Sequence, residues 1–257
     1  MARINRPLSP EKVSVNRTSN SDFINFHAPL GLESEERVAY RRRMILKKGF
    51  FITFEGPECA GKTTQIRLLE RHLKELGRRC LLTREPGGTE IGEQLRHIVK
   101  HHTGRVSDET EVLLFAASRA QHVTTVIRPA VESGTIVICD RFMDSTTAYQ
   151  GCARALNMDF IARLNRFAVS GCVPDLTILM DLAPEESARR SRERETPLGL
   201  DDRIESETID FHRKVRNGFL EIARAEPERV KVVDAANPIE SVRNEIALLV
   251  DDAIRSR

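Results

Sequence analysis

One eight-residue stretch constrains the fold of this chain more than any other feature. Residues 56–63 read G-P-E-C-A-G-K-T and fit the pattern G-x-x-x-x-G-K-[ST] at every fixed position. Glycines let the backbone curl so that several N–H groups point at phosphate oxygens, and the start of a following helix adds positive potential. Lys62 supplies a mobile charge for the β- and γ-phosphates, and the hydroxyl of Thr63 can ligate Mg²⁺. The stretch therefore predicts a P-loop that binds ATP.

The chain from Gly49 onward alternates between two hydrophobic periods. Apolar, β-prone runs occupy residues 50–54, 80–83, 135–139, 176–182 and 229–233, and amphipathic stretches separate them. In the first amphipathic stretch Leu68, Leu69, Leu73 and Leu76 recur at helical spacing, and Gly77 predicts its end. Strands separated by helices pair in parallel through right-handed crossovers. We therefore predict an α/β fold with a helix-covered parallel sheet.

An aspartate stands at the end of the third predicted strand. Asp140 directly follows the run at 135–139. Such a residue is by itself more often a turn or cap. In a P-loop protein, however, a strand beside the first delivers a carboxylate to the Mg²⁺ shell, often through water. We predict that Thr63 and Asp140 form the metal site, with Asp140 acting through water.

The charge of the chain is divided unevenly. The net charge is +2, but residues 1–48 hold ten basic and five acidic side chains, which leaves −3 for the remainder. A remainder of that sign is unlike a general nucleic-acid binder, so no specific nucleic acid is expected. No apolar run approaches the roughly 20 residues of a membrane helix, and the N-terminus has no hydrophobic signal segment. We expect a cytoplasmic protein that does not enter a membrane.

The first 43 residues differ from the rest. They mix proline, serine, asparagine and charge without a sustained period, so we predict a basic, disordered extension over 1–43 and one domain over 44–257. Met44 offers an alternative start, a hypothesis that fails if the native N-terminus retains residues 1–43. The five cysteines form no C-x-x-C pair and predict neither a zinc site nor a disulfide framework.

Four segments together resemble one family, the thymidylate kinases. They are the P-loop with the following Thr64 and Gln65, the R-E-P-G-G-T loop at 84–89, the F-A-A-S-R helix at 115–119, and the D-R-F-M-D-S-T-T-A-Y-Q stretch at 140–150. The likeness covers about residues 48–255. It implies a P-loop NTPase with a five-stranded parallel sheet in the order 2-3-1-4-5, helices on both faces and a short lid at about 189–201. It also implies a homodimer that phosphorylates dTMP to dTDP with ATP and Mg²⁺.

The resemblance assigns roles that the chemistry of the residues supports. Arg84 and Arg141 follow two strands at the sheet edge where α/β folds bind ligands, and a guanidinium matches a monophosphate bidentately. Phe115 and Arg119 share a helix face and would stack on thymine and hydrogen-bond its O4. Tyr149 would lie under the deoxyribose. The predicted dTMP site comprises Glu58, Arg84, Phe115, Arg119, Arg141, Ser145, Thr146, Tyr149 and Gln150.

Two further sets complete the prediction. The ATP site comprises Gly56, Pro57, Glu58, Cys59, Ala60, Gly61, Lys62, Thr63 and Thr64. The P-loop carries no arginine, so the cation for the transition state is expected from the lid, as in the lid-arginine, bacterial type of the family. The catalytic residues are Lys62, Arg141 and the lid arginines Arg190, Arg192 and Arg194.

The P-loop contains one departure from the family. Cys59 stands where glycine is usual, which makes the backbone angles of the turn less free. A thiol in an electropositive loop also suggests a reactive cysteine, a hypothesis that a slow iodoacetamide labelling rate at Cys59 would remove.

Other functions stay open at this point. A different P-loop nucleoside or nucleotide kinase would keep the P-loop but lack the pocket residues from 115 to 150. A GTPase is disfavoured because no N-K-x-D motif occurs. A nucleotide-gated scaffold without enzymatic activity would use the basic tail and predicts salt-dependent DNA binding.

Overall fold

A computed structural model describes residues 49–193, 204 and 206–257. The predicted N-terminal extension at 1–43 and the part of the predicted lid from residue 194 to 201 lie outside the described residues, as does Arg194.

The sheet has the predicted strands in the predicted order. All five strands are parallel and lie in the order β2-β3-β1-β4-β5, which confirms the P-loop NTPase fold. Each observed bound lies within one residue of its prediction. The strands are β1 (Phe50–Glu55), β2 (Cys80–Arg84), β3 (Ile136–Asp140), β4 (Leu176–Asp181) and β5 (Val230–Asp234).

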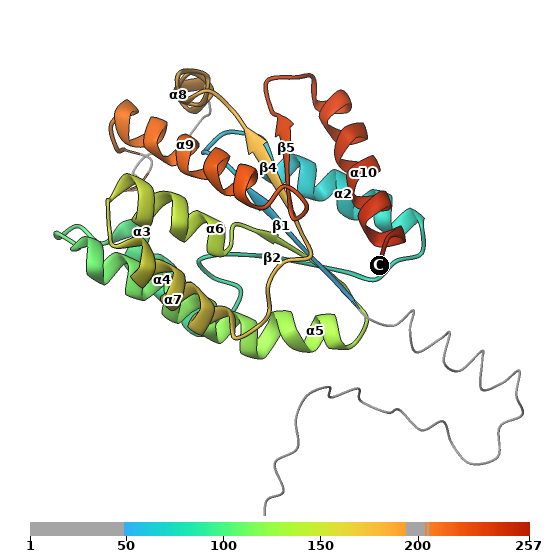
Figure 1. Cartoon of the computed structure of the whole chain (residues 1–257), viewed down its shortest axis with the longest axis horizontal. Coiled ribbons are helices and arrows are strands. Elements are labelled where there is room, and N and C mark those ends of the chain that lie inside the picture. Colours follow the sequence, from blue (N-terminus) through green and yellow to red (C-terminus); the bar gives the residue numbers. More distant parts are fainter. Residues whose placement is uncertain (1–48, 194–203, 205) are drawn as a thin grey trace, which may run out of the picture. The chain divides into compact units, whose positions relative to one another are not determined.

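Helices cover both faces of the sheet because the central strand β1 is apolar on both sides. Phe50, Ile52 and Phe54 belong to a core with α2 (Lys62–Glu75) and α10 (Ile239–Arg255), which lie together on one face (Figure 1). Phe51 points to the other face and meets the ring of Phe142 edge-on at a centroid distance of 4.9 Å. A fully buried central strand fits a sheet with two covered faces.

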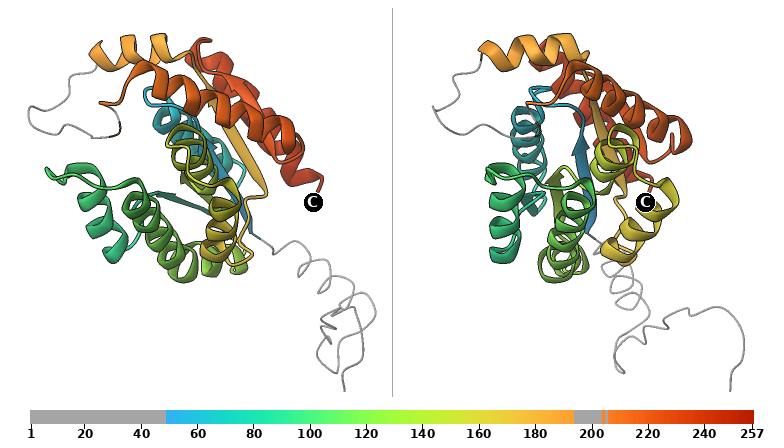
Figure 2. Two further views of the ribbon diagram at one scale, coloured as in Figure 1. Left: turned by 60° about the vertical axis from the view of Figure 1, so that its left-hand side comes forward. Right: turned by 90° about the vertical axis from the view of Figure 1, so that its left-hand side faces the viewer.

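The remaining helices surround the sheet, as two further views show (Figure 2). Two π-helical segments continue their preceding α-helices, and such segments are frequent at functional sites. The π-helical segments are η1 (Val123–Ile127) and η2 (Thr147–Ala153). The α-helices are α3 (Glu90–His101), α4 (Asp108–His122), α5 (Arg128–Glu132), α6 (Met143–Thr146), α7 (Met158–Val169), α8 (Pro184–Glu193) and α9 (Ile209–Ala225).

Helix α2 begins and ends at glycines. Gly61 precedes it with φ +84° and Gly77 follows it with φ +72°, both in the left-handed region that glycine adopts without strain. Leu69 and Leu73 are buried as predicted, whereas Leu76 is 55% exposed because the helix has ended by that residue. None of the described helices combines the length and the apolar composition that crossing a membrane requires.

Candidate active site

A cavity of about 600 Å³ lies beyond the carboxyl ends of β1, β2 and β3. Ligands of open α/β sheets bind at this edge. P-loop residues 58–64 line it, together with Asp140. The predicted acceptor residues that also line it are Arg84, Phe115, Arg141, Ser145, Thr146, Tyr149 and Gln150. The fold thus brings most residues of both predicted groups to one cavity, whereas Gly56, Pro57 and Arg119 do not line it.

The P-loop is held in an unusual backbone conformation. Cys59 has φ +54°, in the left-handed region that costs a residue with a side chain about 1 kcal/mol or more. Gly56 has φ +129°, and a Cβ at this position would lie 2.4 Å from the carbonyl oxygen of Met180. Glycine is therefore required at position 56, whereas position 59 accommodates a cysteine at the expense of strain.

Lys62 lies at the centre of the loop. Its Nζ donates to the carbonyl oxygens of Gly56 at 3.2 Å and Pro57 at 2.7 Å. Burial lowers the pKa of Lys62, and the nearby Arg141 guanidinium lowers it further. The ammonium group is therefore desolvated and ready to exchange carbonyl oxygens for phosphate oxygens.

Thr63 and Asp140 meet as the sequence predicts. The hydroxyl of Thr63 donates to Oδ2 of Asp140 at 3.4 Å. The other carboxylate oxygen, Oδ1, is buried and accepts no hydrogen bond from any described residue. A buried oxygen without a partner is costly unless a ligand satisfies it, so these two residues fit a hard cation or its water. No cluster of three or more His, Cys, Asp or Glu side chains in the described ranges could hold a metal alone.

Arg141 connects the P-loop with the acceptor side. Its NH1 donates to Gly56 O at 2.9 Å and to Ser145 Oγ at 3.2 Å, and its NH2 donates to Glu58 at 2.5 Å. Burial alone would raise the pKa of Glu58, but Arg141 and Lys62 outweigh it and lower that pKa to about 2. The guanidinium also lies 5.2 Å from the ring centroid of Tyr149. Arg141 is thus fixed between the donor and acceptor residues.

Tyr149 presents a buried hydroxyl group to the same region. The side chain lines the cavity, and its hydroxyl oxygen has no hydrogen-bond partner among the described residues. Burial raises the pKa of Tyr149, so the group is a neutral phenol. Such a hydroxyl group is available to a bound ligand.

Glu55 supports the turn that carries Arg141. It is fully buried at the end of β1, and its carboxylate accepts hydrogen bonds from Phe142 N at 2.8 Å, Ser145 N at 3.2 Å and Ser145 Oγ at 2.5 Å. Burial raises the pKa of Glu55 to about 7, with a further contribution from Asp144. Three bonds from one carboxylate hold Arg141 at its left-handed φ of +67°.

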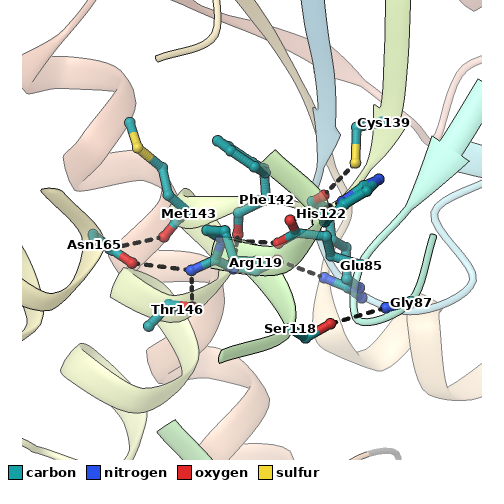
Figure 3. Close-up of polar contacts among 12 residues, drawn as sticks. Glu85, Gly87, Ser118, Arg119, His122, Cys139, Phe142, Met143, Thr146 and Asn165 are labelled. Carbon is teal, nitrogen blue, oxygen red and sulfur yellow. Dashed lines mark hydrogen bonds and ion pairs between the residues drawn. The ribbon is translucent and has the colours of Figure 1, made fainter. Parts of the chain in front are cut away.

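Arg119 lies behind the cavity wall. The side chain is 1% exposed, and Figure 3 shows it reaching Glu85 on one side and Thr146 and Asn165 on the other. With the carbonyl oxygen of Phe142 as a further acceptor, these bonds use four of its five N–H groups. Arg119 does not line the cavity in this structure. Its direct contact with a base remains a prediction.

Glu85 continues this buried network. Its Oε2 accepts from Nε of Arg119 at 2.8 Å, and its Oε1 lies 3.1 Å from Nδ1 of His122 (Figure 3). The other ring nitrogen of His122 lies 2.6 Å from the hydroxyl of Thr83. The network joins the loop after β2 to helix α4.

The other predicted acceptor residues differ in burial and in their hydrogen-bond partners. Phe115 is half-buried and lines the cavity. Arg84 is half-exposed and pairs with Glu93 at 2.9 Å. Gln150 is buried and donates from Nε2 to Oε1 of Glu111 at 2.8 Å.

The lid arginines separate into different environments. Arg190 lines the cavity and donates to the carbonyl oxygen of Ala235 at 3.1 Å. Arg192 is exposed and does not line the cavity. Among the described lid arginines, Arg190 therefore has the position that a transition-state cation requires.

Known proteins match both the sequence and the geometry. The sequence profile of the family described as thymidylate kinase matches residues 54–246. A thymidylate kinase from Syntrophotalea carbinolica is 46% identical over 209 residues, 80% of this chain and 96% of that protein. One from Symbiobacterium thermophilum is 47% identical over 208 residues, 80% of this chain and 95% of that protein.

A solved structure agrees. The crystal structure of thymidylate kinase from Ehrlichia chaffeensis matches this structure with a TM-score of 0.64 and 34% sequence identity. The match covers 79% of this chain and 98% of the Ehrlichia chaffeensis chain. The chain belongs to the thymidylate kinase family. The resemblance inferred from four motifs is thereby confirmed.

Several residues of this thymidylate kinase family member were missed by the sequence reasoning. Glu85, Arg96, Lys100 and Ile204 line the cavity, and Glu55 and Glu111 are buried but do not line it. A signal existed for Glu111, because it precedes Phe115 and Arg119 by one and two helical steps of four residues and so shares their face. An acid within an otherwise apolar strand, as at Glu55, is a similar signal.

Proposed function

We propose that the protein transfers the γ-phosphoryl group of ATP to dTMP, which yields dTDP and ADP. One observation carries the proposal: the P-loop and the acceptor residues line a single cavity, and Arg141 bonds to both the P-loop and Ser145. Membership of the thymidylate kinase family supports the same acceptor.

The reaction needs no nucleophilic side chain. A phosphate monoester has a second pKa of about 6, so the acceptor is largely dianionic at neutral pH and requires no general base. Positioning and charge neutralisation therefore carry the catalysis. Lys62 exchanges the carbonyl oxygens of Gly56 and Pro57 for phosphate oxygens, while Arg141 holds the acceptor phosphate beside the donor and Arg190 approaches from the lid side.

Two residues are suited to holding Mg²⁺. Thr63 and Asp140 would bind it, directly and through water, because Asp140 has a buried oxygen without a partner among the described residues. A bound Mg²⁺ would supply charge neutralisation between the phosphates.

The sugar is recognised by Tyr149 and Glu58 in this proposal. The Tyr149 ring lies beside Arg141 and crowds a 2′-hydroxyl, which favours deoxyribose. Glu58 stays ionised because its pKa is about 2, so it accepts a hydrogen bond from the 3′-hydroxyl.

The protein is expected to form a homodimer through α4 and α7. These two helices pack together and carry apolar side chains that face solvent, Leu113 on α4 and Phe160 and Phe167 on α7, with Phe167 80% exposed. Large exposed apolar side chains are typical of interfaces. Sedimentation of the protein and its Phe167→Asp variant tests this: a monomeric wild type contradicts it.

The proposed activity is tested by an acceptor series. ADP formation is followed with ATP, Mg²⁺ and one of dTMP, dUMP, dCMP or thymidine. The proposal expects turnover with dTMP and none with thymidine, which has no phosphate for Arg141. Preferred turnover of another acceptor supports a different nucleotide kinase, and ATP hydrolysis without an acceptor supports a nucleotide-gated scaffold.

The catalytic domain is proposed to comprise residues 44–257, with 1–43 outside it. The match of the family profile to residues 54–246 supports this division. A chain that starts at Met44 should keep kcat and the KM for dTMP within about twofold of those of the full chain; a larger loss assigns the extension a part in catalysis.

A further inference from the structure

We infer that Glu111 is a positioning residue that selects the nucleobase by fixing the side-chain amide of Gln150. The inference rests on the proposed function and deepens it. None of the four motif segments that resemble the family contains Glu111. The base it selects is one that presents a ring N–H group, as thymine and uracil do at N3.

The two side chains meet inside the protein. Glu111 lies in the first turn of α4 and is 1% exposed, and Gln150 lies in η2 and is 2% exposed. Nε2 of Gln150 donates to Oε1 of Glu111 at 2.8 Å. Because both groups are buried, breaking this hydrogen bond leaves polar atoms unsatisfied and is strongly disfavoured.

The chemistry of Glu111 dictates which end of the amide it binds. An ionised carboxylate has oxygens that only accept, so it must face the NH₂ group and not the carbonyl oxygen of Gln150. The negative charge is compensated by Arg154, whose Nε and NH2 lie 3.4 Å from the two carboxylate oxygens. Arg154 is itself held by Glu207 at 2.5 Å and lies 4.6 Å from the ring centroid of Phe211.

The fixed NH₂ group leaves the carbonyl oxygen for the ligand. Gln150 lines the cavity, and its Oε1 accepts no hydrogen bond from the described part of the chain. An amide oxygen at the cavity is available to a hydrogen-bond donor on the ligand. The N3–H group of thymine or uracil is such a donor. N3 of cytosine is an acceptor, so with cytosine two lone pairs would face each other and no hydrogen bond would form.

Gln150 lines the cavity, whereas Arg119 lies behind its wall. Four of the five N–H groups of Arg119 bond to protein acceptors, and Arg119 does not line the cavity. A site that offers an acceptor to a substrate N–H strongly disfavours an analogue that lacks the donor. With the amide reversed, its NH₂ group would instead favour cytosine.

The test compares dTMP, dUMP and dCMP as acceptors for the wild type and Glu111→Gln. A glutamine at position 111 both donates and accepts, so it no longer dictates the direction of the Gln150 amide. We expect kcat/KM for dTMP and dUMP to fall about tenfold. The preference for dTMP over dCMP should fall by at least the same factor, while the dTMP:dUMP ratio stays unchanged because both bases carry N3–H.

A matched control separates positioning from general loosening of α4. Val112→Ala removes buried atoms at the next position of the same helix and leaves Glu111 in place. This variant should lower the melting temperature and leave the dTMP:dCMP preference unchanged.

A double variant supplies the rescue. Glu111→Gln combined with Gln150→Glu reverses the donor and acceptor of the pair, keeps the net charge and again presents an oxygen acceptor to the cavity. It should recover the dTMP:dCMP preference. If Glu111→Gln alone does not fold, the double variant carries the test by itself.

The inference is overturned if the dTMP:dCMP preference of Glu111→Gln stays within twofold of the wild-type preference. It is also overturned if the double variant does not recover the preference, or if the wild type uses dCMP as well as dTMP. Failure of the proposed function gives a different result, because the wild type then does not turn over dTMP at all.

Discussion

The two halves of the cavity are built in different ways. The donor half is a continuous loop, residues 56–63, of which residues 58–63 line the cavity. The acceptor half gathers side chains from β2, α4, the turn after β3, α6 and η2, which span residues 84 to 150. The donor half therefore depends on local backbone geometry, and the acceptor half depends on packing between elements.

Buried carboxylates hold the side chains of the acceptor half in place. Glu55, Glu85 and Glu111 are each at most 4% exposed, and they hold the turn of Arg141, the side chain of Arg119 and the amide of Gln150. Among the described residues, no buried carboxylate holds the donor loop in this way. Lys62 bonds to carbonyl oxygens of its own loop, and Arg141 donates to the carbonyl oxygen of Gly56. Recognition of the acceptor is thus linked to the stability of the domain, and this comparison can be tested.

The largest effect is expected from Glu85→Ala. It leaves the buried Arg119 and His122 without their shared carboxylate, and breaking a buried ion pair costs about 3–5 kcal/mol. Urea unfolding measures it. The exposed pair of Glu240 with Arg243 is the control, and Glu240→Ala should cost less than about 1 kcal/mol. Equal losses in the two variants contradict the comparison.

Lys62→Ala should affect the rate without affecting the acceptor half. Removal of a group that stabilises transition-state charge lowers kcat about 100- to 1000-fold. Binding of dTMP, measured by calorimetry, should change less than threefold because Lys62 contacts only its own loop in the described network. A kcat within tenfold of the wild type shows that Lys62 has no such role.

Glu55→Gln should change how stability depends on pH. The folded-state pKa of Glu55 is about 7, above its ordinary value of 4.5, so the folded protein keeps a proton that the unfolded chain releases. Wild-type stability is therefore lost as pH rises from 4.5 to 7, by at most about 3 kcal/mol. Glutamine cannot ionise, so the variant should not lose this stability. In urea unfolding, the free energy of unfolding of the variant should therefore rise relative to that of the wild type between pH 4.5 and 7. Parallel pH curves contradict the assignment.

The smallest effect concerns Cys59 in the donor half. Because its φ is +54°, Cys59→Gly should be more stable than Cys59→Ala by about 1 kcal/mol. The alanine variant controls for loss of the thiol. Thermal unfolding of both variants measures the difference, and an alanine variant at least as stable as the glycine variant argues against strain at this position.

The sequence predicted the strands and their order closely. The five strands, their order and the glycine that ends α2 follow from local periodicity, turn residues and the family resemblance. The meeting of Thr63 and Asp140 was also predicted, because parallel strands end at one edge of the sheet. Arg141 was predicted at the same edge, and in the structure its NH1 donates to the carbonyl oxygen of Gly56 in the P-loop.

For the acceptor half, the sequence predicted which residues take part but not how their side chains are arranged. Phe115 and Arg119 share a helix face, yet only Phe115 lines the cavity, because Glu85 and Thr146 retain the guanidinium behind the wall. Glu111 lies on that same face. Nothing in the sequence indicates its contact with Gln150, which is 39 positions away.

The sequence by itself determined that this chain has a parallel sheet, a phosphate-binding loop and the residue types of a thymidylate kinase. These are local properties, since glycine spacing and hydrophobic period act within a few residues. Only the tertiary structure decided which polar side chains reach the cavity and which way the Gln150 amide faces. Those outcomes depend on how buried hydrogen-bonding groups from distant elements satisfy one another, and no local pattern encodes that competition.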